Sequence, residues 1–153
     1  PENVRIWSFF SDGVMGGVSS GKASLKKSEQ DNFVRIEGNV STKNNGGFIQ
    51  IRHNLRKPLE DKIKGMRLKI RGNGENYYIF IRTKATLLPW QFYSLEFPTS
   101  EKWSTVELEF INFKKSSSFL RKTFKSSSIK SVGIVAYGRN HLAKIDISEI
   151  DFF

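Results

Sequence analysis

The chain has 153 residues, no cysteine, and 25 lysines and arginines against 15 acidic residues, a formal net charge of +10. The absence of cysteine excludes disulfides, thiolate metal sites and a cysteine nucleophile. This length suits one folded domain, expected over residues 1–153, and no apolar run approaches the roughly 20 residues of a membrane-spanning helix. We expect no signal peptide in the sequence given, and therefore a cytoplasmic location in a bacterium or an organellar one in a eukaryote.

Alternation of apolar and polar residues, the period of a β-strand, recurs along the chain, whereas helical periodicity is scarce. Strands are predicted, in chain order, at 34–37, 48–52, 66–71, 77–82, 91–97, 106–110, 132–137 and 145–152. The segment 132–137 is apolar on both faces, which is typical of a central strand that is covered on both sides. The apolar phase slips between Ile147 and Ile150, which predicts a β-bulge there.

Glycine and asparagine clusters such as Asn44-Asn45-Gly46-Gly47 and Gly72-Asn73-Gly74 separate these strands and are typical of tight turns. Only residues 58–64 favour a short helix or turn. Many short strands joined by turns favour an all-β antiparallel sandwich or barrel. From the alternation we predict these core residues: Met66, Leu68, Ile70, Ile79, Ile81, Val106, Leu108, Phe110, Val132 and Ile134.

The positive charge is concentrated in two segments. Residues 52–71 hold eight bases and two acids, and residues 114–130 hold six bases and no acid. Basic patches favour anionic partners, which are acidic proteins, anionic membrane surfaces or nucleic acid. A surface that serves only solubility explains the same charge, so the charge alone does not choose a function.

No arrangement of residues favours catalysis or metal binding. The two histidines, His53 and His141, are isolated, and no metalloprotease, nucleophile-elbow or P-loop motif is present. The glycine-rich segment Asp12–Gly17 is not followed by a helical pattern, as a phosphate loop requires. The spacing of Asp12, Asp146 and Asp151 is not that of a calcium loop. We therefore assign no catalytic residue, no cofactor and no metal, and predict that the chain is not an enzyme.

A more informative feature is the face that the strands turn away from the core. Because alternate side chains of a strand point to opposite faces, three sets of residues are predicted to point away from the core. Each set contains both aromatic and polar side chains: Phe48, Gln50 and Arg52; Tyr78, Phe80 and Arg82; Trp90, Phe92 and Ser94. Such side chains anchor protein partners, and they also suit sugar rings. The alternative to a binding face is that a loop of the same chain, such as residues 114–125, covers these side chains. We place the centre of a binding face at these residues: Arg52, Arg82, Tyr78 and Trp90.

Four blocks of sequence resemble the complex I intermediate-associated protein 30 family. They are Trp7 with Ser11-Asp12-Gly13-Val14-Met15-Gly16-Gly17-Val18-Ser19, Asn45-Gly46-Gly47-Phe48-Ile49-Gln50-Ile51-Arg52, Ile70-Arg71-Gly72-Asn73-Gly74, and Trp90-Gln91-Phe92-Tyr93. The resemblance covers nearly the whole chain in order. The third block usually contains Gly-Asp-Gly, so Asn73 departs from the pattern and puts in doubt any role that needs a carboxylate there.

The resemblance implies a galactose-binding-like fold, so we predict a single-domain jelly-roll β-sandwich over residues 1–153. Mitochondrial members of the family act as assembly factors for respiratory complex I, and relatives by fold include carbohydrate-binding modules. The leading hypothesis is therefore a non-enzymatic binding module, an assembly chaperone or scaffold whose protein partner belongs to a membrane-associated complex. The alternative is a carbohydrate-binding module that uses the aromatic and arginine residues. Peripheral contact with an anionic membrane surface is a further hypothesis. Nucleic-acid binding is supported only by the net positive charge.

Overall fold

The computed structural model describes residues 7–11, 19–27, 32–43 and 47–153. Within these residues, strands form two antiparallel sheets that face each other as the layers of a sandwich, and η4 (Phe110–Asn112) and η5 (Ser126–Ser128) are short 3-10 turns. The predicted all-β class is therefore confirmed.

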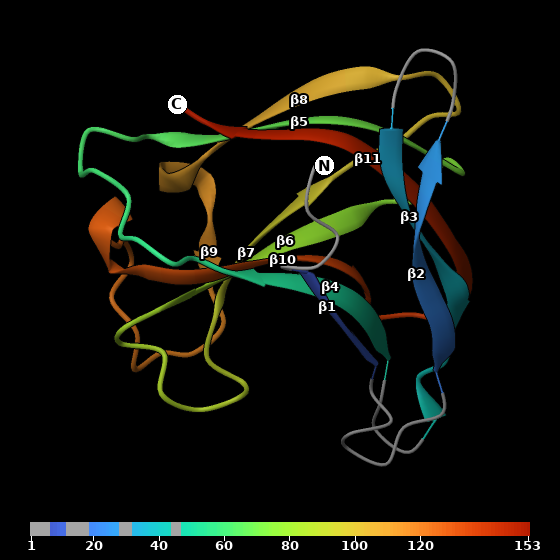
Figure 1. Cartoon of the computed structure of the whole chain (residues 1–153). Helices are drawn as coiled ribbons and strands as arrows, with labels where there is room; N and C mark the ends of the chain where they lie inside the picture. Colours follow the sequence, from blue (N-terminus) through green and yellow to red (C-terminus); the bar gives the residue numbers. More distant parts are fainter. Residues whose placement is uncertain (1–6, 12–18, 28–31, 44–46) are drawn as a thin grey trace.

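In the part of the chain that the structure describes, the two sheets have six and five strands. Sheet A has the order β1 (Trp7–Ser11), β4 (Phe48–Asn54), β10 (Ile129–Tyr137), β6 (Tyr77–Thr83), β7 (Tyr93–Phe97) and β9 (Lys114–Lys115). Sheet B has the order β2 (Ser20–Lys27), β3 (Asn32–Val40), β11 (His141–Phe152), β5 (Gly65–Gly72) and β8 (Ser104–Glu109). Sheet A is the lower layer of Figure 1, with β5, β8 and β11 above it. Because the chain repeatedly crosses between sheets, strands distant in sequence become neighbours, as in a jelly roll.

The core lies between the two sheets. Nine of the ten predicted core residues are buried there, and the tenth, Val106, is half-buried and packs against the core. Val106 lies on β8, which is an edge strand of sheet B, so one side of it has no neighbouring strand. The alternation of the sequence therefore predicts the inward face of the strands correctly.

Two finer predictions are also confirmed. Strand β10 lies between β4 and β6 inside sheet A, and residues 132–136 are buried on both faces. In β11, Ile147 pairs with Ile70 whereas Glu149 pairs with Lys69, so the register shifts at Ser148. This is the predicted β-bulge, and it returns Ile150 and Phe152 to the core side, where both pack against the cluster.

The sequence did not predict β1, β2 or β9. Strand β2 carries only Ala23 and Leu25 as apolar residues among glycine, serine and lysine, so its alternation is weak. It forms because the edge of β3 pairs with it along its whole length. The predicted strand 106–110 ends one residue early, since Phe110 begins η4.

Candidate functional site

The outer face of sheet A carries the residues that alternation turned away from the core. Strand register places Arg52 of β4 and Phe80 of β6 on either side of Gly133 in β10, and Gln50 and Tyr78 on either side of Val135. The core residues of the same strands point the opposite way. We call this surface the aromatic–arginine face and define it by these residues: Gln50, Arg52, Tyr78, Phe80, Arg82, Trp90, Phe92 and Tyr137.

Gly133 makes room for a buried amide at the middle of this face. A Cβ at Gly133 would lie 2.9 Å from Oε1 of Gln50 and 3.4 Å from the carbonyl oxygen of Ile51. Gln50 is only 5% exposed. The missing side chain therefore lets the Gln50 amide lie close to β10, with Arg52 and Phe80 bordering the same glycine.

Aromatic rings form a continuous cluster on the face. Phe80 stacks on Phe92 with ring centroids 4.1 Å apart and an interplanar angle of 15°. Tyr78 and Phe80 each pack edge-on against Tyr137, at 5.5 and 5.3 Å. Phe80 is buried beneath its neighbours, whereas Tyr137 is exposed and Tyr78 and Phe92 are partly exposed. The cluster is therefore a packed platform with exposed rings around a buried one.

Arg82 holds the loop that carries Trp90. Its guanidinium donates one hydrogen bond to the carbonyl oxygen of Pro89 at 2.8 Å and another to that of Gln91 at 3.2 Å. These two carbonyls flank Trp90, whose own carbonyl accepts a hydrogen bond from the Ser116 hydroxyl at 2.6 Å. The Trp90 side chain is 62% exposed. Arg82 therefore fixes the backbone on both sides of an exposed tryptophan.

The electrostatics of the face are those of partly desolvated cations. Burial lowers the pKa of Arg52, and burial together with the nearby charge of Arg52 lowers the pKa of Arg82. Two guanidinium groups that repel each other in a partly dry setting favour a ligand rich in negative charge or acceptor oxygens. Tyr78 donates a hydrogen bond to Oε2 of Glu96 at 3.1 Å, and burial followed by Glu96 raises the pKa of Tyr78.

The segment 114–125, which was the predicted alternative cover, packs at the edge and end of the sandwich. Strand β9 pairs with β7 at the margin of sheet A. Farther along, Leu120 is buried in the core and Phe124 packs against Tyr93 with ring centroids 4.6 Å apart. These contacts explain how a serine-rich segment is held without regular structure.

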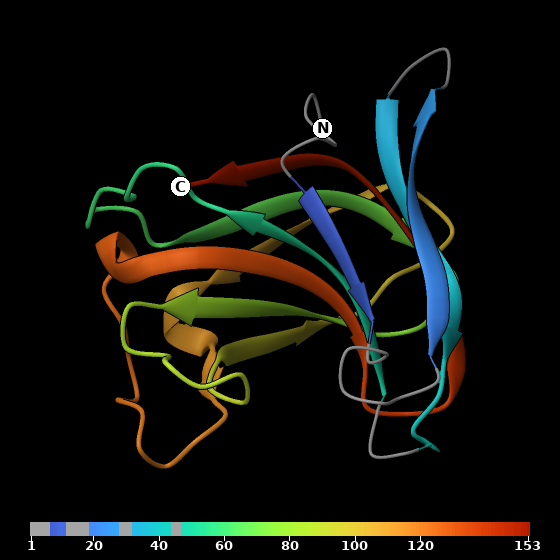
Figure 2. The same cartoon turned by 60° about the horizontal axis from the view of Figure 1, so that its bottom comes forward.

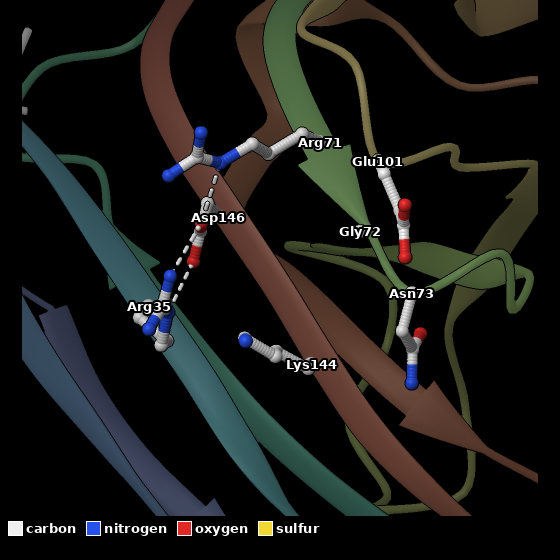
Figure 3. Close-up of a pocket in the computed structure, with 7 residues that line it drawn as sticks. All are labelled: Arg35, Arg71, Gly72, Asn73, Glu101, Lys144 and Asp146. Carbon is white, nitrogen blue, oxygen red and sulfur yellow. Dashed lines mark hydrogen bonds and ion pairs between the residues drawn. The ribbon is translucent and has the colours of Figure 1, made fainter.

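A second cluster, which the sequence did not reveal, lies on the outer face of sheet B (Figure 3). The Asp146 carboxylate is 3% exposed and accepts hydrogen bonds from Arg35 at 2.8 and 3.0 Å and from Arg71 at 2.8 Å. Burial acts to raise the pKa of Asp146, but the two arginines outweigh it and the pKa lies below its ordinary value. The cluster borders a pocket of about 310 Å³ that Lys144 also lines.

Aromatic rings complete the sheet B cluster. The Arg71 guanidinium carbon lies 4.6 Å from the ring centre of Trp103 and 5.0 Å from that of Phe33. Strand register brings the three charged residues together, because Asp146 is directly opposite Arg35 on one side and Arg71 on the other. The arrangement binds its own carboxylate, so we regard it as a structural ion cluster.

The remaining chemical candidates have structural partners. Nδ1 of His141 lies 2.8 Å from the carbonyl oxygen of Arg139. Asn73 accepts a hydrogen bond from the Tyr77 hydroxyl at 2.6 Å and donates one to the carbonyl oxygen of Leu142 at 2.8 Å. A carboxylate at position 73 could not donate the second bond, which gives a physical use for the departure from Gly-Asp-Gly.

In the ranges that the structure describes, no three histidine, aspartate or glutamate side chains gather as a metal site would require. Within the same ranges, no helix has the length and apolar character needed to cross a bilayer. The glycine-rich segment Asp12–Gly17 lies outside the described residues.

The fold is a galactose-binding-like β-sandwich of the kind found in carbohydrate-binding modules. A family 11 module from Clostridium thermocellum, solved with a β-1,3-1,4-mixed-linked tetrasaccharide, matches with a TM-score of 0.81 at 15% identity, covering 99% of this chain and 91% of that one. A family 30 carbohydrate-binding module matches with a TM-score of 0.65 at 13% identity over 90% and 91%. An exo-β-agarase matches with a TM-score of 0.65 at 9% identity over 97% of this chain and 23% of that enzyme. At such identities the likeness concerns the fold alone.

The family itself is established by the sequence. The model of the complex I intermediate-associated protein 30 family matches residues 1–147, so the chain belongs to that family. The predicted resemblance is therefore confirmed. No curated protein matches the chain significantly.

Proposed function

We propose that this chain is a non-enzymatic binding module that acts as an assembly factor for a membrane-associated, multisubunit complex of the respiratory complex I type. Membership of the family supports this role. The proposed binding site is the aromatic–arginine face, centred on Arg52, Arg82, Tyr78 and Trp90. An assembly factor needs a surface that holds a partner subunit without chemical change, and a rigid sheet face provides one.

The observation that carries the proposal is the pairing of two partly buried arginines with a packed aromatic platform. Tyrosine, tryptophan and arginine are enriched among the residues that dominate binding energy at protein interfaces. The repulsion between Arg52 and Arg82 favours a partner carboxylate or main-chain carbonyl near them. Trp90 and Tyr137, which are exposed, provide apolar area for a partner.

A second candidate function, carbohydrate binding, is favoured by the same rings. The family 11 module that shares this fold was solved with a mixed-linked tetrasaccharide. Partly exposed Tyr78 and Phe92 provide ring faces, and the half-buried Arg52 provides hydrogen-bond donors for hydroxyls. A glycan array with the full chain separates the two candidates. Specific sugar binding that is lost in Trp90→Ala supports the carbohydrate-binding module, whereas an array without a hit leaves the protein-binding proposal as the stronger.

The decisive experiment is affinity capture from native cells at low salt, with the bound proteins identified by mass spectrometry. We expect subunits of one membrane-associated complex to be captured by the unaltered chain and lost with Arg52→Ala. Arg67→Ala is the matched control, because Arg67 is a partly exposed arginine on sheet B, away from the face. Failure to recover any subunit of such a complex, or equal recovery with both variants, would contradict the proposal.

A further inference from the structure

Exposed apolar side chains gather at one corner of the sandwich. Among the described residues, eight large hydrophobic side chains are exposed, and four of them lie in two loops: Leu87 (80%), Leu88 (43%), Trp90 (62%) and Phe119 (91%). The first loop, residues 84–92, joins β6 to β7, and the second, residues 116–125, follows β9. Figures 1 and 2 both show these loops projecting side by side from the same corner. We call them the paired loops.

The structure ties the paired loops together at their bases. The Phe92 amide donates to the Ser116 hydroxyl at 2.8 Å, and that hydroxyl donates to the carbonyl oxygen of Trp90 at 2.6 Å. The Ser116 amide also donates to the carbonyl oxygen of Phe92 at 2.8 Å. Both loops line one pocket of about 590 Å³. The two apolar tips are therefore parts of one surface.

The local structure turns the apolar tips outward. The buried Gln91 side chain accepts hydrogen bonds from the amides of Leu87 and Leu88, each at 3.0 Å, which closes the loop on itself. In the second loop Leu120 is 6% exposed and anchors the chain in the core, while its neighbour Phe119 is 91% exposed. The exposure of these tips thus results from turns that hydrogen bonds and a buried leucine hold in place. It leaves apolar surface in water, which costs free energy.

The charge around the tips is positive. Residues 84–92 contain one base and no acid, and residues 114–130 contain six bases and no acid. Lys84, Arg121, Lys122 and Lys125 are all exposed. Two acids, Asp61 and Glu109, line the neighbouring pocket together with Lys64 and Lys125. The corner keeps a clear excess of positive charge.

We propose that the paired loops dock the protein on the surface of an anionic lipid bilayer. Leu87 and Phe119 would enter the boundary between headgroups and acyl chains, and the surrounding lysines and arginines would lie at the level of the lipid phosphates. Exposed apolar tips with basic residues behind them are the pattern of interfacial membrane binding, and each base near an anionic surface adds attraction. Trp90 suits the same depth, because indole prefers the interface.

A bilayer fits these residues better than a nucleic acid does. Proteins bind single-stranded nucleic acid with aromatic side chains that stack on the nucleobases and with lysines and arginines that contact the phosphates. An exposed aliphatic side chain such as Leu87 contributes to neither interaction. The proposal depends mainly on Leu87, Phe119 and the basic residues around them, none of which belongs to the aromatic–arginine face. Trp90 is shared with the proposed function, so the binding test uses variants of the other residues. It would orient the aromatic–arginine face beside a membrane, where partners from a membrane-associated complex are found.

The test is flotation of the full chain with vesicles of phosphatidylcholine alone or of phosphatidylcholine and phosphatidylserine in equal parts. We expect binding to the anionic vesicles that weakens as salt is raised. The double variant Leu87→Ser with Phe119→Ser should bind at least about tenfold more weakly, since two apolar tips no longer enter the bilayer. Arg121→Glu with Lys122→Glu should also lose about tenfold or more.

Matched controls use exposed residues at other places. Leu142 is 71% exposed on β11, and Lys102 is exposed in the turn before β8, so Leu142→Ser and Lys102→Glu should bind like the unaltered chain. Quenching of tryptophan emission by brominated acyl chains, lost in Trp90→Phe, should show contact with the bilayer interior. Thermal melts of all variants check that each is folded.

Three results would overturn the proposal. The first is no binding to anionic vesicles by a chain that still captures its protein partner, which would leave the proposed function intact. The second is vesicle binding that the loop variants and the controls share equally. The third is binding of a single-stranded oligonucleotide that depends on Arg121 and Lys122 without any binding to vesicles, which would assign the basic corner to nucleic acid.

Discussion

Arg52 and Phe80 lie directly opposite each other across Gly133, so that a guanidinium group and an aromatic ring border the same glycine of a central strand. The two residues are far apart in sequence and lie on different strands. They come together because β10 lies between β4 and β6. It also depends on the absence of a side chain at Gly133, since Gln50 occupies the space that a Cβ would take.

Gly133→Ala should therefore weaken partner binding more than it weakens the fold. The new Cβ would meet Oε1 of Gln50 at 2.9 Å, and the flexible amide would have to move outward over the face. We expect a loss of stability of about 1 kcal/mol, typical of mild overpacking, and a clear loss of affinity. Chemical unfolding and binding of the captured partner measure the two effects. Unchanged affinity in the folded variant would contradict the placement of the site.

Arg82→Ala should weaken partner binding and also destabilise the fold by about 1–2 kcal/mol, because the carbonyls of Pro89 and Gln91 lose their donor. Arg52→Ala should weaken partner binding by about 1–3 kcal/mol. Trp90 emission should shift in Arg82→Ala, because the backbone on both sides of Trp90 is released. A melting temperature of Arg82→Ala equal to that of the unaltered chain would show that Arg82 does not hold the loop.

The comparison of Arg82 with Arg52 shows what the sequence could predict. Alternation placed both arginines on the face opposite the core, because the side-chain period of a strand is two. It did not reveal that Arg82 binds main-chain carbonyls, since backbone acceptors leave no pattern in the sequence. Proximity of the two guanidinium groups also required the order of strands, which alternation does not provide.

The ion cluster of sheet B escaped prediction for a related reason. Asp146 is separated from Arg35 by 111 positions and from Arg71 by 75. An aspartate between two isoleucines was compatible with an exposed strand position, and only the register of β3, β11 and β5 shows that it is buried. By contrast, the bulge at Ser148 was predictable, because it leaves a phase slip in the apolar pattern.

Asp146→Asn should destabilise the fold by about 3 kcal/mol, since it leaves two arginines without their shared carboxylate in a partly buried setting. Asp151→Asn is the matched control, because Asp151 lies on the same strand and is exposed. Urea unfolding of the two variants and the unaltered chain measures the difference. A loss no larger than that of the control would show that the cluster adds little to stability.

Acid should weaken the fold through the same carboxylate. The pKa of Asp146 is lower in the folded chain than its value of about 3.9 in the unfolded chain. The stability that the carboxylate contributes is therefore fully present above about pH 3.9 and is lost as the pH falls through the folded-state pKa. The melting temperature of the unaltered chain should therefore fall more steeply below about pH 4 than that of Asp146→Asn. Parallel curves for the two proteins would assign the acid sensitivity to other groups.

Alkali should act through Tyr77. Burial raises the pKa of this phenol to about 12, and its hydroxyl accepts a hydrogen bond from the Lys144 amide at 2.8 Å while donating to Asn73. In the unfolded chain the phenol ionises near pH 10, so its contribution to stability is present below about pH 10 and is lost as pH rises toward 12.

Tyr77→Phe should be less stable at neutral pH by about 1–2 kcal/mol, because the Asn73 carbonyl and the Lys144 amide lose a partner. It should also lose less stability between pH 9 and 11, which thermal melts at several pH values in that interval measure. Tyr137→Phe is the control, since Tyr137 is exposed, and a steep alkaline loss that Tyr77→Phe retains in full would exclude Tyr77 as its source.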